Sequence, residues 1–260
     1  MDKDIKNHQQ HLKNLIERSK KSFAYYLIEE AFYAALDIKQ LDWANAFLRI
    51  ITSKFTQSVK SMRMLGMLYE ALQDHEKAKE IYQELILLNP NDTQSVKRLV
   101  ALERDRNHLS DAITLLNKYL ENNQQDMEAW LELTDMYLAK QNYAKASFCY
   151  EEVLSLQPNN FIVNLRYAEM LYSQGGADNL DSLYLARKYY SHALTMQDDK
   201  SNMLSRALWG LLQTCKQLDI LMKNKEEKNT EIILTCQQKL KEIYSKSNNK
   251  IEINSMKLMN

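Results

Sequence analysis

The chain has 260 residues, with 34 Lys and Arg against 34 Asp and Glu, so its formal net charge is zero. A neutral chain lacks the basic surface that phosphate binding needs, which argues against a role on nucleic acid. Only four glycines and two prolines are present, which is too little turn chemistry for a sheet protein and favours helices with short connections.

Residues 1–24 are expected to form an N-terminal leader, and its start, MDKDIKNHQQ, is polar and lacks the apolar core of a secretory signal. Residues 4–21 can form a leading helix with its apolar residues on one face. No apolar run in the chain approaches the roughly 20 residues that span a bilayer. We therefore expect a cytoplasmic protein with no transmembrane segment of its own.

A 34-residue repeat organises the chain from residue 25 onward. Its best copy reads Trp130-x2-Leu133-Thr134-x2-Tyr137, then Ala146-x3-Tyr150, then Pro158. This is the tetratricopeptide pattern with threonine in place of glycine. The small-residue position recurs without insertion or deletion at Ala44, Ala78, Ala112 and Ala146. An alanine there lets the second helix of each repeat cross the first closely, so a larger side chain is expected to force the helices apart.

The repeat predicts an all-α fold, a tetratricopeptide-repeat superhelix (α-solenoid) of about five to six helical hairpins with extra terminal helices. The expected repeats cover 25–58, 59–92, 93–126 and 127–160, with an extended fifth over 161–200 and a partial sixth over 201–219. Residues 220–260 are expected to hold a charged linker, a C-terminal helix around 231–245 and a frayed tail.

The fifth repeat is stretched. Its small and aromatic positions are Ala186 and Tyr190, which fall six residues later than the phase predicts. The extra residues lie in the stretch SQGGADNLDS, residues 173–182, which holds two of the four glycines. Glycine and Asp-Asn favour turns, so we expect an elongated, exposed loop between the two helices of this repeat.

No catalytic, cofactor or metal site is expected. None of the five histidines stands in a zinc-binding spacing, and Gly175-Gly176 lacks the Lys-Ser/Thr of a phosphate-binding loop. The cysteines, Cys149, Cys215 and Cys236, are far apart and form no C-x-x-C pair, which predicts reduced, structural thiols.

The first helices of the repeats should line a concave face that binds a peptide segment. The positions expected to face a partner there are Tyr26, Tyr33, Lys60, Arg63, Met67, Lys97, Arg104, Leu131, Asp135, Leu138, Leu165 and Tyr172. Basic residues gather in the middle of this set, and the alternative is that they are ordinary solvated side chains. The binding interpretation predicts that reversing the charges of Arg63 and Lys97 weakens assembly and leaves the melting temperature nearly unchanged.

One family resemblance rests on particular stretches of the chain. The run from Asp126 to Asn160 and the following "YAEMLYSQGG…NL…ARKYYSHAL" resemble subunit 2 of the endoplasmic reticulum membrane protein complex, its tetratricopeptide subunit. Generic tetratricopeptide repeats lack that stretched fifth repeat. The resemblance covers residues 25–245.

The resemblance implies a non-catalytic scaffold on the cytosolic face of the endoplasmic reticulum, within an insertase for tail-anchored and other weakly hydrophobic transmembrane segments. It implies three partners: the cytosolic tail of subunit 5, the cytosolic part of subunit 3, and a subunit of the 8/9 type. The alternative is a free cytosolic adaptor that binds a peptide of a chaperone or of another assembly. The Asn positions of the chaperone-binding clamp are occupied by Met67 and Ala101, which disfavours a chaperone adaptor.

Overall fold

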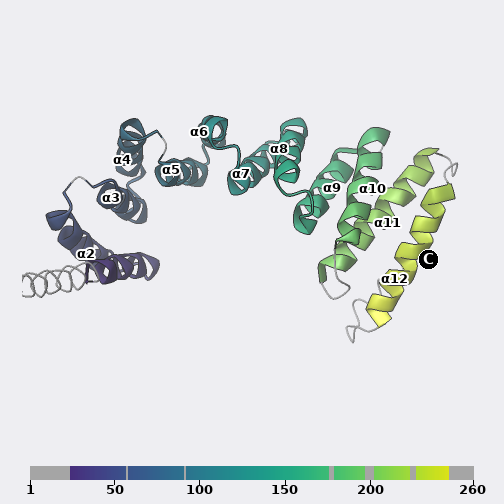
Figure 1. The fold of residues 1–260 in the computed structure, drawn as a ribbon, viewed down its shortest axis with the longest axis horizontal. Coiled ribbons are helices and arrows are strands. Elements are labelled where there is room, and N and C mark those ends of the chain that lie inside the picture. The colour runs from purple at the N-terminus through teal and green to yellow at the C-terminus, as the bar shows by residue number, and fades with distance from the viewer. Residues whose placement is uncertain are drawn as a thin grey trace, which may run out of the picture. The chain divides into compact units, whose positions relative to one another are not determined.

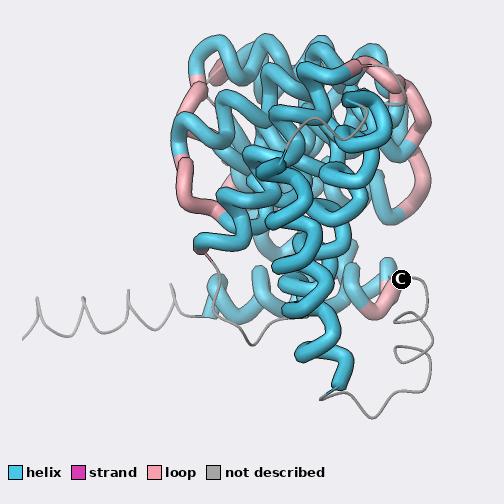
Figure 2. The backbone as a smooth tube through the Cα atoms, turned by 90° about the vertical axis from the view of Figure 1, so that its right-hand side faces the viewer, coloured by secondary structure: helices cyan, strands magenta, loops and turns pink. Residues whose placement is uncertain are grey.

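The computed structural model describes residues 24–56, 58–90, 92–175, 179–196, 202–222 and 227–245, and all regular secondary structure in these ranges is helical (Figure 2). After a helical stretch over residues 24–37, the helices labelled in Figure 1 are α2 (Leu41–Lys54), α3 (Val59–Ala71), α4 (His75–Leu88), α5 (Thr93–Asp105), α6 (Leu109–Asn122), α7 (Met127–Ala139), α8 (Tyr143–Leu156), α9 (Phe161–Gly175), α10 (Leu180–Thr195), α11 (Asn202–Met222) and α12 (Glu227–Ser245). The predicted leading helix over 4–21 and the tail after Ser245 lie outside the described residues.

The turn inside each of the first four hairpins uses one backbone device. The non-glycine residues with positive φ in the described chain are spaced by 34: Lys39 (57°), Gln73 (61°), Asn107 (65°) and Gln141 (55°). In each case this residue and the next donate their N–H groups back to the end of the preceding helix, for example Gln73 to Glu70 and Asp74 to Tyr69. This left-handed ending satisfies carbonyl groups that the helix leaves unpaired.

Short polar side chains cap the second helices α4, α8 and α10. Asp74 and Asn142 accept hydrogen bonds from the backbone N–H three residues later, and Asn179 does the same at the start of α10. An oxygen at this position pairs one of the free N–H groups of the first helical turn. Helix ends with local signals of this kind explain how two prolines and four glycines suffice for the chain.

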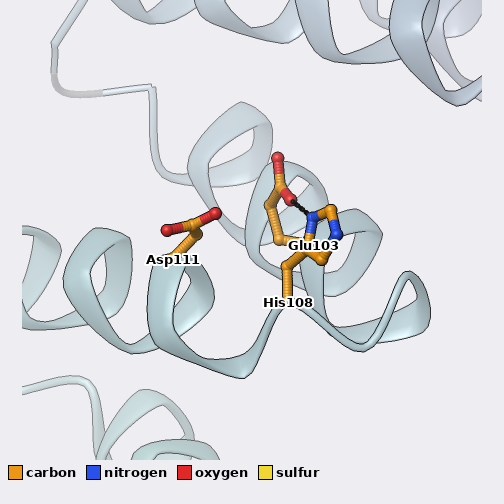
Figure 3. A group of neighbouring side chains, drawn as sticks. All are labelled: Glu103, His108 and Asp111. Atoms are coloured by element: carbon orange, nitrogen blue, oxygen red, sulfur yellow. Dashed lines mark hydrogen bonds and ion pairs between the residues drawn. The ribbon is translucent and has the colours of Figure 1, made fainter.

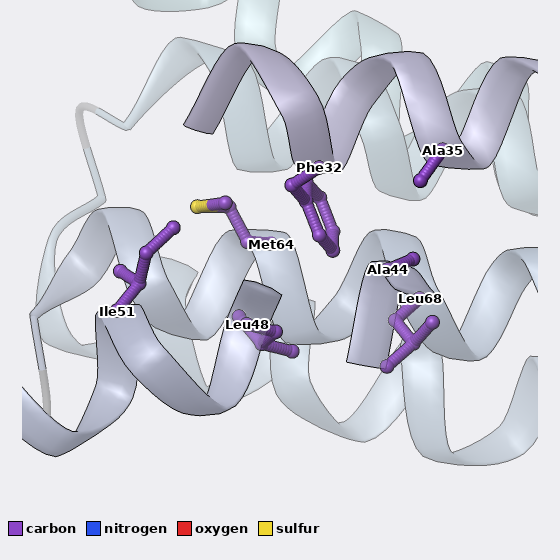
Figure 4. Close-up of a cluster of buried hydrophobic side chains, with 7 residues drawn as sticks. All are labelled: Phe32, Ala35, Ala44, Leu48, Ile51, Met64 and Leu68. Carbon is purple, nitrogen blue, oxygen red and sulfur yellow. The ribbon is translucent and has the colours of Figure 1, made fainter. Parts of the chain in front are cut away.

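The chain forms two compact units that divide inside α6, between Tyr119 and Leu120. In the first unit, Phe32 points toward Leu48 and Met64, and the crossing alanine Ala44 is fully buried beside them (Figure 4). Ala78 is also fully buried, in a second cluster with Tyr82. A β-carbon added to Gly66 would lie 2.6 Å from the ring of Tyr82, so the glycine of the repeat pattern is required by the close approach of that ring.

In the second unit, α9, α10, α11 and α12 pack in sequence, and α11 also contacts α9 (Figure 1). Ala146, Ala186 and Ala193 are fully buried in this unit, and Tyr190 is 2% exposed. Gly210 of α11 lies against the Tyr190 ring, 2.3 Å from where its β-carbon would be. The small and aromatic positions of the stretched fifth repeat therefore pack tightly, like those of the regular repeats.

The expected elongated loop over residues 173–182 is wrong for most of its length. Residues 173–175 belong to α9 and residues 180–182 belong to α10, so the connection is limited to 176–179. The extra length of the fifth repeat lies mainly in longer helices, of 15 and 16 residues against 13 and 14 in α7 and α8. Asn179 caps α10, so the Asp-Asn pair marks a helix start rather than a free loop.

The C-terminal helix begins earlier than the apolar pattern predicts, at Glu227 instead of residue 231. Cys236 and Leu240 of α12 are buried, and Trp209 of α11 donates a hydrogen bond of 2.6 Å to the Tyr244 hydroxyl. Helix α12 therefore covers the apolar face of α11, with its own exposed face largely polar.

We predict that Ala146→Leu destabilises the protein by about 1–3 kcal/mol, because a larger side chain overfills a fully buried helix crossing. Ala144→Leu, on the exposed side of the same helix, is the matched control and should change stability by less than about 0.5 kcal/mol. Urea unfolding followed by circular dichroism compares the two. Equal midpoints for the two variants would mean that Ala146 does not occupy a close crossing.

Candidate interaction surface

The first unit carries two adjoining hollows on its first helices. One has a volume of about 770 Å³ and the other about 480 Å³. They share four lining residues, which come from the 24–37 helix, α3 and α5: Tyr33, Met67, Arg98 and Ala101. Because these three helices are the first helices of successive hairpins, we call the two hollows together the first-helix groove.

The structure brings together six of the residues predicted to face a partner. Tyr33 and Met67 line both hollows; Lys60, Arg63 and Lys97 line the smaller one, and Arg104 lines the larger one. Tyr26 lines a third hollow, of about 380 Å³, with Tyr25 and Phe55, and Lys60 lines this hollow as well as the smaller one of the groove. Arg98 was not in the predicted set, although it contributes to both hollows of the first-helix groove.

The basic residues of the groove are balanced by acids. Lys60 Nζ lies 2.6 Å from Glu29 Oε1, and Arg98 Nη1 lies 3.5 Å from Glu70 Oε2. Glu70 also accepts a 2.5 Å hydrogen bond from the Tyr82 hydroxyl. Burial and this bond raise the pKa of Tyr82 far above its ordinary value, so its hydroxyl remains a donor.

Arg63 has a structural role that contradicts the expected freedom of its side chain. Its guanidinium pairs with both carboxylate oxygens of Asp92, at 2.8 and 2.9 Å, and contacts Ser95 Oγ at 3.3 Å. Asp92 is 7% exposed and Ser95 is fully buried. The pair contradicts the free side chain on which the prediction of an unchanged melting temperature rests, because charge reversal at Arg63 would leave a buried carboxylate facing a like charge.

In the second unit, Asp135 and Leu138 line a hollow of about 460 Å³ with Tyr150, Arg166 and Arg206 among its other residues. Arg206 binds Glu169 through two hydrogen bonds, and this pairing raises the pKa of the arginine further. Both side chains line the hollow, whose lining mixes charged residues with apolar and aromatic ones.

Three further predicted residues of the second unit do not line that hollow. Leu131 and Tyr172 are half-buried. Leu165 is 2% exposed, so its assignment to a partner-binding surface is wrong. It belongs to α9, which is covered by both α10 and α11, and this double cover leaves no surface for a leucine at that position.

One group in the described residues has the composition of a metal site: Glu103, His108 and Asp111 (Figure 3). Both oxygens of Glu103 are already engaged, one with Lys79 Nζ at 2.6 Å and the other with His108 Nδ1 at 3.0 Å. Burial raises the pKa of Glu103, but the bonds from Lys79 and His108 outweigh it and hold the pKa below its ordinary range. A lysine ammonium on the same carboxylate opposes cation binding, so the group is an ion-pair cluster that joins α4 to α5.

The cysteines are buried thiols. Burial raises the pKa of Cys149 to about 12 and that of Cys236 to about 11, so both remain protonated at neutral pH. A protonated, buried thiol is a poor nucleophile and a poor metal ligand.

Helical hairpins repeated every 34 residues, with a hollowed surface on their first helices, define a tetratricopeptide-repeat protein of scaffold type. A solved tetratricopeptide-repeat protein from Cytophaga hutchinsonii has the same fold: it superposes with a TM-score of 0.66 over 91% of this chain and 89% of its own, at 16% identity. A solved MamA protein superposes with a TM-score of 0.53 at 15% identity, over 74% of this chain and 96% of its own.

Sequence comparison shows the family. The profile of the EMC2 TPR-like repeat domain matches residues 41–176. ER membrane protein complex subunit 2-A of Xenopus laevis is 36% identical over 187 residues, covering 72% of this chain and 61% of the frog protein. Subunit 2 of Dictyostelium discoideum is 31% identical over 241 residues, covering 90% of this chain and 74% of the relative. The chain belongs to the ER membrane protein complex subunit 2 family, and it matches less than two thirds of the length of the frog relative.

Among the described residues, none of the helices combines the length and the apolar character that crossing a bilayer requires.

Proposed function

We propose that this chain is a non-catalytic scaffold subunit of the ER membrane protein complex, on the cytosolic face of the membrane, where it holds cytosolic segments of other subunits. Its relatives carry the name of that complex, and this supports membership. The complex is proposed to act as an insertase for tail-anchored and other weakly hydrophobic transmembrane segments. The partners proposed for this chain are the subunit 5 tail, the cytosolic part of subunit 3 and a subunit of the 8/9 type.

The first-helix groove is the observation that supports a binding role. It places an aromatic side chain, Tyr33, and a flexible apolar one, Met67, between basic side chains on one hollowed face. Apolar anchors in such a groove supply most of the affinity for a peptide, while the charges orient it. A partner segment with apolar residues and with charged groups of both signs matches this lining.

Membership is tested by purifying the tagged chain from membranes in a mild detergent. The proposal expects membrane-protein subunits of the complex in stoichiometric amounts. Recovery of the chain alone, or with chaperones in their place, would contradict membership and favour the free adaptor.

We predict that Ala101→Trp blocks the groove. Ala101 is exposed, lies in both hollows, and carries only a methyl group, so a tryptophan there fills space without removing an ion pair. Recovery of the segment-binding partner should fall by about tenfold, the effect of losing on the order of 1.4 kcal/mol of binding free energy. Ala34→Trp, at an exposed alanine outside both hollows, is the control and should keep all partners. Full recovery with Ala101→Trp would place the binding surface elsewhere.

A further inference from the structure

The outer face of α2 departs from the pattern of its own repeat. Trp43 and Ile50 are 62% and 45% exposed. The residues 34, 68 and 102 positions later in the chain are charged in every case: Lys77 and Glu84 in α4, Asp111 and Lys118 in α6, and Lys145 and Glu152 in α8. The repeat therefore tolerates charge at these two positions, and its packing does not require the tryptophan or the isoleucine of α2.

The exposed apolar residues of α2 form an ordered surface. Trp43, Ala46, Phe47 and Ile50 are spaced i, i+3, i+4 and i+7, and we call this set the α2 ridge. Phe47 also packs against the core, and its ring lies 6.1 Å from that of Trp43, which limits the freedom of the tryptophan. Four residues with this spacing surround the hole that receives one side chain of a facing helix in knobs-into-holes packing, and the small Ala46 leaves that hole open.

Basic side chains flank the ridge. Lys39 precedes α2, and Arg49 and Lys54 lie in its second half; all three are exposed, and none forms an ion pair with a described residue. Asp42, in the first turn, is the single acid of α2. The face thus offers an apolar hole with uncompensated positive charge at its edges.

We propose that the α2 ridge binds an amphipathic helix of a partner protein, with an apolar side chain in the hole and acidic residues beside Lys39 and Lys54. This surface goes beyond the proposed groove, because it lies on a second helix and the groove lies on first helices. A lipid surface would match the basic residues but makes no use of the four-residue hole. The geometry therefore favours a helix over a membrane.

The test replaces the ridge by the residues of the same positions in α4, giving Trp43→Lys with Ile50→Glu. Both side chains are exposed, so the fold should be retained. Loss of a tryptophan anchor should lower the recovery of one partner from membranes about tenfold. Leu87→Lys is the matched control, since Leu87 is 82% exposed in the same unit but outside the ridge, and it should leave recovery unchanged.

A photocrosslinking residue at position 43 of the full chain then identifies what covers the ridge, with position 77 of α4 as the control. A crosslink from position 43 to a segment of another protein, with apolar residues three and four apart and acids beside them, supports the proposal, and a crosslink to residues of this chain itself overturns it. Equal crosslinking from positions 43 and 77, or none from 43, overturns it. So does ridge-dependent binding of the purified chain to phosphatidylcholine–phosphatidylserine vesicles, which would make the ridge a membrane contact. If the wild-type chain recovers no complex subunit, the proposed function fails, and the crosslink still decides the ridge.

Discussion

Trp130→Ala is expected to destabilise the protein by about 3–5 kcal/mol, the usual cost of removing a large aromatic side chain from a core. Trp130 is 8% exposed, its Nε1 donates a 2.9 Å hydrogen bond to the Gln124 carbonyl oxygen, and its ring meets Phe148 edge-on at 6.0 Å. The substitution removes the ring and also leaves that carbonyl without its donor. Urea unfolding followed by circular dichroism measures the loss as a lower midpoint.

Two matched variants separate the contributions to stability of the Trp130 N–H donor and of the ring contact with Phe148. Trp130→Phe keeps most of the ring and removes the N–H donor, so it should cost about 1 kcal/mol. Phe148→Ala removes the 54%-exposed partner ring and should also cost about 1 kcal/mol. If Trp130→Ala unfolds at the wild-type midpoint, the tryptophan is a surface residue available to partners and the core assignment is wrong.

The fold could be predicted from the sequence because the same packing positions, a small residue and an aromatic one, recur in successive repeats. The alanine at each crossing and the aromatic residue four positions later are buried in every hairpin where they occur in phase, as Ala78 and Tyr82 illustrate. The positive-φ turns were not predicted, because Lys39, Gln73 and Gln141 are not residues that signal a left-handed conformation. The two glycines in residues 173–182 led to the wrong prediction of an elongated loop. Capping by Asn179 and burial of the following helix outweigh the local turn preference there.

The sequence predicted where several residues of the candidate surface lie, but not which other side chains they contact. Counting along the repeat places Tyr33, Met67 and Lys97 on one hollowed face, which the structure describes as the first-helix groove. The count carries no information about partners from the next hairpin, so it could not show that Arg63 meets Asp92 across 29 residues. Nor could it show that α11 returns to contact α9, the helix that carries the buried Leu165.

Arg63→Glu is expected to destabilise the first unit by about 3–5 kcal/mol, because it removes the partner of a buried carboxylate and adds a like charge. The Arg63 side chain is 17% exposed and that of Asp92 is 7% exposed. Through Asp92 and Ser95, the guanidinium ties α3 to the start of α5, two helices later. Lys60→Glu, on the same helix face, is the control: its side chain is 60% exposed, so its pairing with Glu29 should contribute less than about 1 kcal/mol.

Arg63→Leu adds a pH test of the same contact. Burial raises the pKa of Asp92, but the hydrogen bonds from Ser95 and Arg63 outweigh it and hold the pKa below the ordinary value of 3.8. A carboxyl whose pKa is lower in the folded state stabilises the fold above its unfolded pKa, and this contribution is lost as the pH falls through the folded value. The stability difference between wild type and Arg63→Leu should therefore be full at neutral pH and shrink below about pH 4, as Asp92 becomes protonated. A difference that stays constant down to pH 3 would mean that the variant acts through lost packing of the arginine stem and not through the charge on Asp92.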